Sequence, residues 1–170
     1  LGLPLEILST AMREGLKVFS VVKGKKQLPV FLGIADAPSD AKALIRSGFE
    51  RVLKARLEDA KFFWEQDLKT PLRKRAPALK HVLFQEKLGS YDDKVKRIAK
   101  IAAYLGGKLA APGDVKKFVA AAELCKVDLV TDMVREFPSL QGRVGGLYAR
   151  AEGQPESIVR AIYEHYQPVG

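Results

Sequence analysis

The chain has 170 residues, enough for one domain or for one domain with a small appendage. Hydrophobic residues make up 47% and aromatic residues 8% of it, which excludes a disordered chain and indicates a globular fold with a real core. The net charge is +9, and residues 1–85 carry 16 Lys and Arg against 9 Asp and Glu. A basic half of this kind favours a polyanionic partner such as nucleic acid, and a solvated lysine-rich surface is the alternative that charge alone leaves open.

The apolar runs are only a few residues long, whereas a membrane-spanning helix needs about 20, so we expect no membrane partner. Cys125 is the only cysteine, which excludes an intrachain disulfide and favours a reducing, intracellular compartment. The chain begins at Leu1 without a signal pattern, and we expect it to be an excised fragment of a longer protein.

The first elements predicted are a short helix and a hairpin. Residues 4–14 are typical of a helix that has Pro4 near its first turn. Residues 17–22 and 28–35 are rich in Val, Phe, Leu and Ile and predict two strands, with Gly24 in the turn between them. Pro29 places the second strand at an edge or makes it an entry position.

A long helix is predicted from Ser39 or Asp40, either of which can cap it, to about Leu68. Arg56 and Asp67 fall on its apolar stripe, where a charge must be paired or must face a partner. The stripe itself comprises Ile45, Phe49, Val52, Ala60 and Phe63.

Further helices are predicted after Pro71. One covers residues 72–80 despite Pro77, and one begins at the N-cap Ser90 and ends at Gly106 and Gly107. Three later helices are predicted. The first is opened by Pro112 and Asp114 and continues to about Glu136, and the other two cover residues 140–151 and 155–166. The fold class predicted is therefore mainly α, a multi-helix bundle preceded by a small α+β hairpin unit.

Residues for catalysis are scarce. A metal site needs three or four converging ligands, and the chain offers His81, His165 and one cysteine without a His-Asp pair. Residues 142–146 are glycine-rich but lack the Lys-Ser/Thr of a phosphate-binding loop, and their glycines favour close helix packing. We predict no catalytic residue, no metal site and no cofactor in this chain.

A basic surface is the better candidate. Arg51, Lys54 and Lys61 lie on the polar side of the long helix, although glutamates dilute them. The stretch from 69 to 80 contains no acid, and side chains of this kind bind phosphates without reading sequence. Its cations are Lys69, Arg73, Lys74, Arg75 and Lys80.

Four blocks of the sequence stand out: residues 51–69, with Phe-Phe-Trp-Glu-Gln-Asp near the end, residues 82–89, with Phe84 and Gly89, residues 124–142, with Glu-Phe-Pro before Gly142, and residues 161–168. Together they resemble the bacterial glycyl-tRNA synthetase β subunit. Their order and spacing agree across nearly the whole chain. The chain departs from the family pattern at Gly15, Leu16, Ser20 and Phe49, so the resemblance carries no tRNA contact at those positions.

The resemblance implies an internal piece of the β subunit of a cytoplasmic tetramer of α and β subunits that joins glycine to its tRNA with ATP. The α subunit would carry catalysis and use the ATP. Residues 1–37 would end a tRNA-editing-like (B3/B4-type) α+β unit, and residues 38–170 would form a helical domain similar to HD-type phosphohydrolases. Asp128, near a family acid, would then be a structural hydrogen-bond acceptor because the metal-binding His-Asp is missing.

Three functional hypotheses remain open. The first is binding of tRNA(Gly), along its acceptor arm, by basic side chains. The second is a scaffold that packs against the α subunit or the rest of β and would use Glu136, Gln141 and Arg56. The third, an active phosphohydrolase, conflicts with the ligand count. The residues chosen for nucleic-acid binding are Arg51, Lys54, Lys74, Arg75, Lys80 and Lys87.

Overall fold

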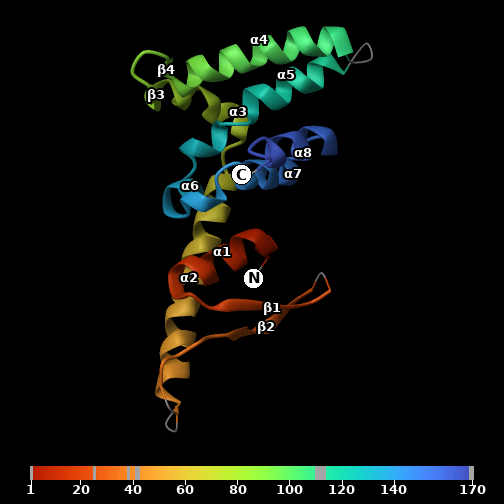
Figure 1. The fold of residues 1–170 in the computed structure, drawn as a ribbon. Coiled ribbons are helices and arrows are strands. Elements are labelled where there is room, and N and C mark those ends of the chain that lie inside the picture. The colour runs from red at the N-terminus through yellow and green to blue at the C-terminus, as the bar shows by residue number, and fades with distance from the viewer. Residues whose placement is uncertain (1, 25, 38, 41–42, 110–113, 169–170) are drawn as a thin grey trace. The chain divides into compact units, whose positions relative to one another are not determined.

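The computed structural model describes residues 2–24, 26–37, 39–40, 43–109 and 114–168. The chain is mainly helical with a small hairpin near its N-terminus, as predicted (Figure 1). By compactness it separates into two units, residues 1–65 and residues 66–170, which are described one at a time. The expected division after residue 37 and the likeness to HD-type domains stay predictions.

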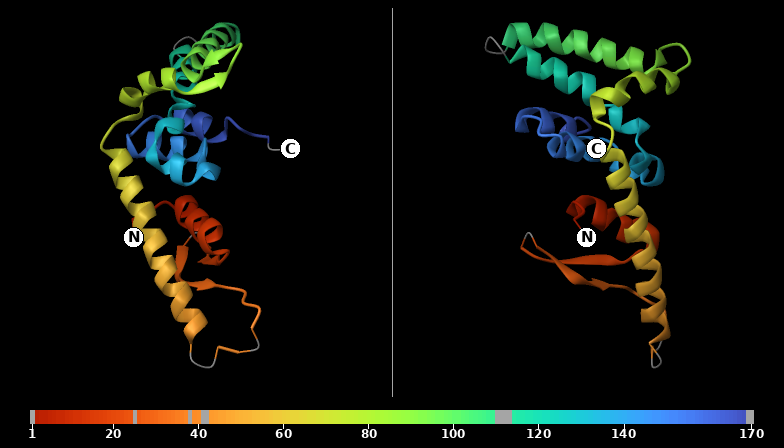
Figure 2. Two further views of the ribbon diagram at one scale, coloured as in Figure 1. Left: turned by 90° about the vertical axis from the view of Figure 1, so that its left-hand side faces the viewer. Right: turned by 180° about the vertical axis from the view of Figure 1, so that it is seen from behind.

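The first unit joins a helix, a hairpin and most of the long helix. Strands β1 and β2 are antiparallel, with Phe19 opposite Leu32 and Lys23 opposite Lys26. Gly24 has φ +61°, a left-handed conformation that favours glycine, as the predicted turn requires. Figures 1 and 2 show α1 and the hairpin beside the N-terminal part of α2. The elements are α1 (Leu5–Leu16), β1 (Phe19–Lys23), β2 (Lys26–Leu32) and α2 (Leu44–Leu68), the last of which continues into the second unit.

The core of the first unit lies between α1, the hairpin and α2. Met12, Val18 and Leu53 are buried at its centre. The predicted stripe of α2 is wrong at Val52, whose side chain is exposed. Four-residue steps from Phe49 reach Leu53 and Leu57 instead. Val52 directly precedes the buried Leu53 and is therefore turned about 100° away from it around the helix.

Asp40 supplies the predicted cap of α2 from outside the helix. Its two carboxylate oxygens accept hydrogen bonds from the amides of Ile45 and Arg46, at 3.0 and 2.9 Å. These amides have no partner within the helix, so the carboxylate satisfies two of its orphan donors. The same bonds lower the pKa of Asp40.

The second unit contains the other helices and a very short hairpin. Helices α4 and α5 run side by side, as do α7 and α8 (Figures 1 and 2). The elements are α3 (Leu72–Arg75), the 3₁₀ helix η1 (Ala76–His81), β3 (Leu83–Gln85), β4 (Gly89–Ser90), α4 (Tyr91–Leu109), α5 (Val115–Leu124), η2 (Val127–Val130), α6 (Asp132–Glu136), η3 (Pro138–Leu140), α7 (Arg143–Ala151) and α8 (Glu156–Glu164).

The start of α4 confirms the predicted cap at Ser90. The Asp93 amide donates to Ser90 Oγ at 3.2 Å, and the Asp93 carboxylate accepts from the Ser90 amide at 2.9 Å. This reciprocal pair is a capping box with aspartate in place of glutamate. The predicted end of the helix at Gly106 and Gly107 is wrong, because α4 continues to Leu109. A Cβ on Gly106 would lie 2.8 Å from the Phe118 ring, so this glycine admits α5 rather than ending α4.

Two predicted helices are broken in the structure. The one expected over residues 72–80 changes to a 3₁₀ helix at Ala76, next to Pro77. The one expected to reach Glu136 ends at Leu124 and restarts at Asp132. Thr131 explains the restart, because its hydroxyl donates to the Asp128 carbonyl and accepts from the Val134 amide, which makes it the N-cap of α6. Pro112, predicted to open α5, lies outside the described residues.

Close packing of α7 on α8 depends on glycine. A Cβ on Gly146 would lie 2.6 Å from the Tyr163 Cβ and 3.0 Å from its backbone nitrogen. This confirms that the glycines of residues 142–146 serve helix packing. In the described part of the chain, no helix is both long enough and apolar enough to cross a membrane.

Candidate nucleic-acid interface

The residues predicted to bind nucleic acid fall in both units. Arg51 and Lys54 are exposed on α2 in the first unit, where Lys54 Nζ lies 4.0 Å from the Glu58 carboxylate. Three of the predicted residues are exposed in the second unit: Lys74 on α3, Lys80 on η1 and Lys87 in the turn between β3 and β4. Within the described ranges, no carboxylate forms an ion pair with Lys74, Lys80 or Lys87.

Arg75, the remaining predicted residue, is occupied inside the second unit. Its Nη2 atom lies 3.1 Å from Asp67 Oδ1 and donates to the Asp67 carbonyl at 3.0 Å. Its Nε atom donates to the Thr70 carbonyl at 3.1 Å. The side chain is 18% exposed, so a phosphate would compete with an existing ion pair. Arg75 therefore stabilises the fold by binding Asp67 and Thr70, and its role in nucleic-acid binding stays a prediction.

Asp67 is the acceptor at the centre of this network. Its carboxylate accepts from the amides of Asp132 and Met133, at 3.1 and 2.9 Å, and so caps α6 from a distant part of the sequence. It also accepts from the Tyr148 hydroxyl at 2.9 Å. Burial and the Asp67 carboxylate raise the pKa of Tyr148, which keeps the phenol protonated as a donor. The prediction that a charge on the α2 stripe must be paired or must face a partner is confirmed for Asp67, which is paired with Arg75.

Asp128 is fully buried where η2 faces the start of α7. Its Oδ2 atom accepts a hydrogen bond from the Gly142 amide, whereas Oδ1 has no partner among the described residues. Burial raises the pKa of Asp128 to about 6, against the opposing effects of the Gly142 amide and of Lys126. Through Oδ2, Asp128 acts as a structural hydrogen-bond acceptor, as the family resemblance led us to expect.

A group of rings and ammonium groups, which we call the aromatic–lysine cluster, comes from four parts of the second unit: β3, α4, the link after α5 and the residues after α8. Lys94 Nζ lies 3.6 Å above the centre of the Phe84 ring and 5.8 Å from that of Tyr91. The Phe84 and Tyr91 rings meet edge to face at 5.3 Å. The cluster comprises Phe84, Tyr91, Lys94, Lys126, His165 and Tyr166.

Lys126 occupies the other half of the cluster. Its Nζ atom lies 3.6 Å above the Tyr166 ring and 2.8 Å from His165 Nε2. His165 Nδ1 lies 2.5 Å from the Ile162 carbonyl, so the ring must donate there and present the Nε2 lone pair to Lys126. Burial and the two lysines lower the pKa of His165, which favours this neutral ring. Sequence reasoning missed the cluster because only Tyr91 and Lys94 share a helical face.

Metal ligands do not gather in the described part of the chain. In residues 2–24, 26–37, 39–40, 43–109 and 114–168, no three His, Cys, Asp or Glu side chains are placed to hold a metal ion. His81 is exposed at the end of η1, and His165 is engaged with Lys126.

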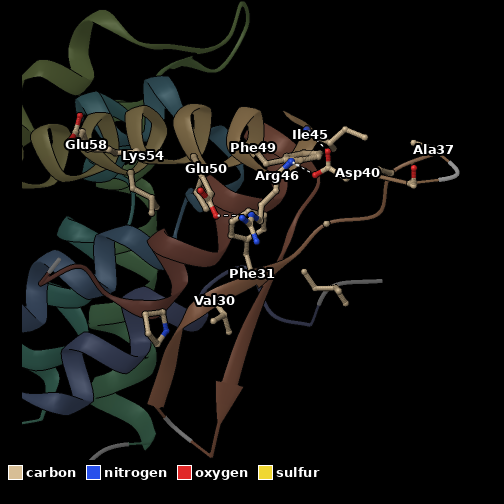
Figure 3. Close-up of a pocket in the computed structure, with 17 residues that line it drawn as sticks. Val30, Phe31, Ala37, Asp40, Ile45, Arg46, Phe49, Glu50, Lys54 and Glu58 are labelled. Carbon is tan, nitrogen blue, oxygen red and sulfur yellow. Dashed lines mark hydrogen bonds and ion pairs between the residues drawn. The ribbon is translucent and has the colours of Figure 1, made fainter. Parts of the chain in front are cut away.

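A pocket of about 900 Å³ lies in the first unit, between β2, the segment after it and α2 (Figure 3). Phe31 and Phe49 form part of its apolar wall, with ring centres 6.3 Å apart. Arg46 and Glu50, paired at 3.7 Å, lie at its edge with Lys54. This wall resembles an incomplete core more than a site for a charged substrate.

Comparison with known protein families identifies the family of this chain. The family model for the glycyl-tRNA synthetase beta subunit matches residues 1–170. The chain belongs to this family.

Similar proteins with known names support the same family assignment. The glycine–tRNA ligase beta subunit of Geotalea daltonii is 47% identical over 99% of this chain. Those of Trichodesmium erythraeum and Thermotoga maritima are 45% and 43% identical over 99% and 98% of it. The chain spans 24% of the length of the Geotalea and Trichodesmium proteins and 25% of the Thermotoga protein.

Parts of two blocks that carry the family resemblance form junctions between elements. Residues 82–89 include the β3–β4 hairpin, in which the Gln85 side chain accepts from the Lys87 amide at 2.7 Å. Residues 136–142 include η3 and end at Gly142, whose φ of +83° aims its amide at Asp128. The Gln141 side chain donates to the Tyr166 hydroxyl. Gln85 therefore stabilises the turn between β3 and β4, and Gln141 connects the end of η3 to Tyr166.

Proposed function

We propose that this segment of the β subunit binds the phosphate backbone of tRNA(Gly) through exposed lysines of the second unit. In this proposal the segment serves ATP-dependent glycylation without a catalytic residue of its own, and ATP is used by the α subunit. One observation carries it: Lys74, Lys80 and Lys87 are exposed and lack acidic partners in the described part of a chain from this family.

Unpaired surface lysines suit phosphate contacts because nothing has to be displaced from them. Each phosphate that a lysine neutralises releases counterions, which makes affinity fall steeply with salt. Such contacts position RNA without selecting its sequence. We place them on the acceptor arm, following the family resemblance. Hydroxyl-radical footprinting of tRNA(Gly) on the whole enzyme tests this placement, and protection confined to the anticodon arm would contradict it.

The central experiment removes the three lysines from the whole α–β enzyme. The variant Lys74→Gln/Lys80→Gln/Lys87→Gln should bind tRNA(Gly) more weakly at 50 mM salt, and its affinity should depend less on salt. If all three contact phosphates, the slope of log affinity against log salt should become shallower by about 2 to 3. Fluorescence titration of labelled tRNA at 50 and 200 mM salt measures both quantities.

A matched control removes three charges that the structure shows to be paired. Lys96 lies 2.7 Å from Asp92, Lys117 lies 2.7 Å from Asp114, and Arg160 lies 3.0 Å from Glu164. Substituting glutamine at these three positions changes net charge equally and should leave the salt slope within about 0.5 of the parent. Equal slopes for the two triple variants would refute the proposed surface.

A second candidate function, assembly, is favoured by the hairpin unit. Several large apolar side chains of the hairpin and the segment after it are exposed, and an apolar pocket opens beside them. Exposed apolar surface of this kind marks a contact with another chain or segment. The side chains are Phe19, Val22, Val30, Leu32 and Ile34.

The scaffold candidate has its own test. The double variant Leu32→Glu/Ile34→Glu in the full-length β subunit should reduce the amount of α subunit that co-elutes in size exclusion without tRNA. Ile101→Glu, on an exposed position of α4, serves as the control for adding a charge at an apolar surface residue. Normal co-elution and normal thermal stability of the double variant would exclude both a contact with α and one with the rest of β.

A further inference from the structure

The aromatic–lysine cluster, which lies outside the predicted binding residues, combines features of a ligand site. Its two lysines come from α4 and from the link after α5, and His165 and Tyr166 come from the residues directly after α8. The rings hold each ammonium group at 3.6 Å from a ring centre, which fixes its position. A lysine fixed in this way loses little conformational freedom when it meets a ligand.

The charges of the cluster are not balanced inside the second unit. Lys126 is only 6% exposed, and Lys94 is half-buried. Among the described residues, neither forms an ion pair with a carboxylate. Asp128 attracts Lys126 from beyond ion-pair distance, and Arg97 adds a repelling charge near Lys94. Buried charges are normally paired, so this site lacks a counter-charge.

The physical consequences of the missing counter-charge fall on both lysines. Burial lowers the pKa of Lys126, and burial together with the nearby Lys126 ammonium lowers that of Lys94. An anion bound at these ammonium groups would favour their charged forms and so oppose both effects. His165 already accepts from Lys126 through Nε2 and cannot also be the counter-charge, because it is a neutral ring in this arrangement.

We propose that the aromatic–lysine cluster is a phosphate-binding site that takes a backbone phosphate of the bound RNA, with Lys94 as its accessible donor. This rests on the proposed function and adds a contact that the exposed lysines do not supply. A phosphate oxygen accepts from ammonium groups and carries the missing negative charge. The Phe84 and Tyr91 rings hold the amine of the half-buried Lys94, and the nearly buried Lys126 adds a second positive charge close enough to act on Lys94.

The test substitutes Lys94 in the whole α–β enzyme. Lys94→Met keeps the aliphatic packing on Phe84 and removes the charge, and Lys94→Arg keeps the charge. Lys94→Met should weaken tRNA(Gly) binding and make the salt slope shallower by about 1, and the loss of affinity between 50 and 200 mM salt should shrink about threefold. Lys94→Arg should restore the parent slope. Lys96→Met, at an exposed lysine of the same helix that is paired with Asp92 at 2.7 Å, should not change it.

A second measurement works on the unmodified enzyme and does not depend on a variant that folds. Acylation of Lys94 by an amine-reactive reagent, followed by mass spectrometry, should be slowed at least threefold by tRNA(Gly). Equal protection by the same molar amount of inorganic phosphate would show a site for small anions and would overturn the RNA assignment. Equal Lys94 reactivity in the α–β enzyme with and without tRNA would overturn it as well, including the case in which the α subunit already covers the site.

The outcome separates this inference from the proposed function. If the Lys74, Lys80 and Lys87 variant leaves the salt slope unchanged but Lys94→Met reduces it, the proposed contacts of the three exposed lysines are refuted and the phosphate site at the cluster is supported. If Lys94→Met leaves the slope unchanged in a folded enzyme while the triple variant reduces it, the cluster is a structural feature only.

Discussion

The Tyr148 hydroxyl donates a hydrogen bond of 2.9 Å to the Asp67 carboxylate, which is 81 positions away in the sequence. Both side chains are buried, and the same carboxylate caps α6 and pairs with Arg75. One acid thus connects the end of α2 to α3, α6 and α7 within the second unit. Because this acceptor is ionic and buried, each of its donors should contribute measurably to stability.

The variant Tyr148→Phe should destabilise the chain by about 1.5 to 3 kcal/mol, since it removes one hydrogen bond to a buried charged group. Urea unfolding followed by circular dichroism measures the change. In an Asp67→Asn background the same substitution should cost at least 1 kcal/mol less, because the acceptor is no longer charged, by the logic of a double-mutant cycle. Strictly additive effects would contradict the coupling between these side chains.

Arg75 and Lys74 should differ in stability although they are neighbours with the same charge. Arg75→Met breaks the ion pair with Asp67 and should cost about 2 to 4 kcal/mol, less than a lone buried pair because three other donors still serve the carboxylate. Lys74→Met removes an exposed, unpaired side chain and should change stability by less than about 0.5 kcal/mol. Thermal unfolding of the two variants compares them. A tolerated Arg75→Met would free Arg75 for a role in tRNA binding.

Asp128 should make stability depend on pH in a definite direction. Its pKa rises from 3.8 to about 6 on folding, so the folded state holds the proton more tightly. The stabilising contribution is complete below about pH 4 and is lost as pH rises through about 6. Between pH 4 and pH 7.5 the parent should therefore lose up to about 3 kcal/mol relative to Asp128→Asn, whose amide oxygen still accepts from Gly142.

Urea unfolding of the parent and of Asp128→Asn at several pH values isolates this effect. Burial lowers the pKa of His165 on folding, so its contribution to stability has the opposite sign and grows as pH rises. That contribution is common to both proteins and cancels in their difference. A difference that is constant from pH 4 to pH 7.5 would show that Asp128 titrates normally.

Local signals in the sequence predicted the elements well and their interruptions poorly. The caps at Asp40 and Ser90 depend on neighbouring residues and were predictable, as was the turn at Gly24. The interruption of the predicted helix before Thr131 and the continuation of α4 past Gly106 depend on contacts between distant elements. The spacing of apolar residues in the sequence carries no information about such contacts. Glycine is typical of a helix C-terminus, but Gly106 lies inside α4, where it allows close packing against Phe118 of α5.

The candidate sites divide in the same way. A run of basic residues without acids identified Lys74 and Lys80 as exposed cations, because charge and local helical position suffice for that. The same run included Arg75, whose acceptors at Asp67 and Thr70 could not be assigned from composition. The aromatic–lysine cluster depends on bringing Lys126 and Tyr166 beside α4, which only the packing of α5 and α8 against their neighbours achieves.

Two glycines of helices should respond in opposite directions to alanine. At Gly146 the added methyl group would meet Tyr163 at 2.6 Å and its backbone at 3.0 Å, so α7 and α8 must separate, at a cost of about 1 to 3 kcal/mol. At Gly107 the added group meets no other atom within 4 Å, and the lower entropy of the unfolded chain should stabilise α4 by about 0.5 to 1 kcal/mol. Thermal unfolding of Gly146→Ala and Gly107→Ala gives both signs. If Gly146→Ala were as stable as the parent, the close contact between α7 and α8 would not be needed for folding, and the glycine would have to be explained by the neighbouring Gly142–Asp128 junction.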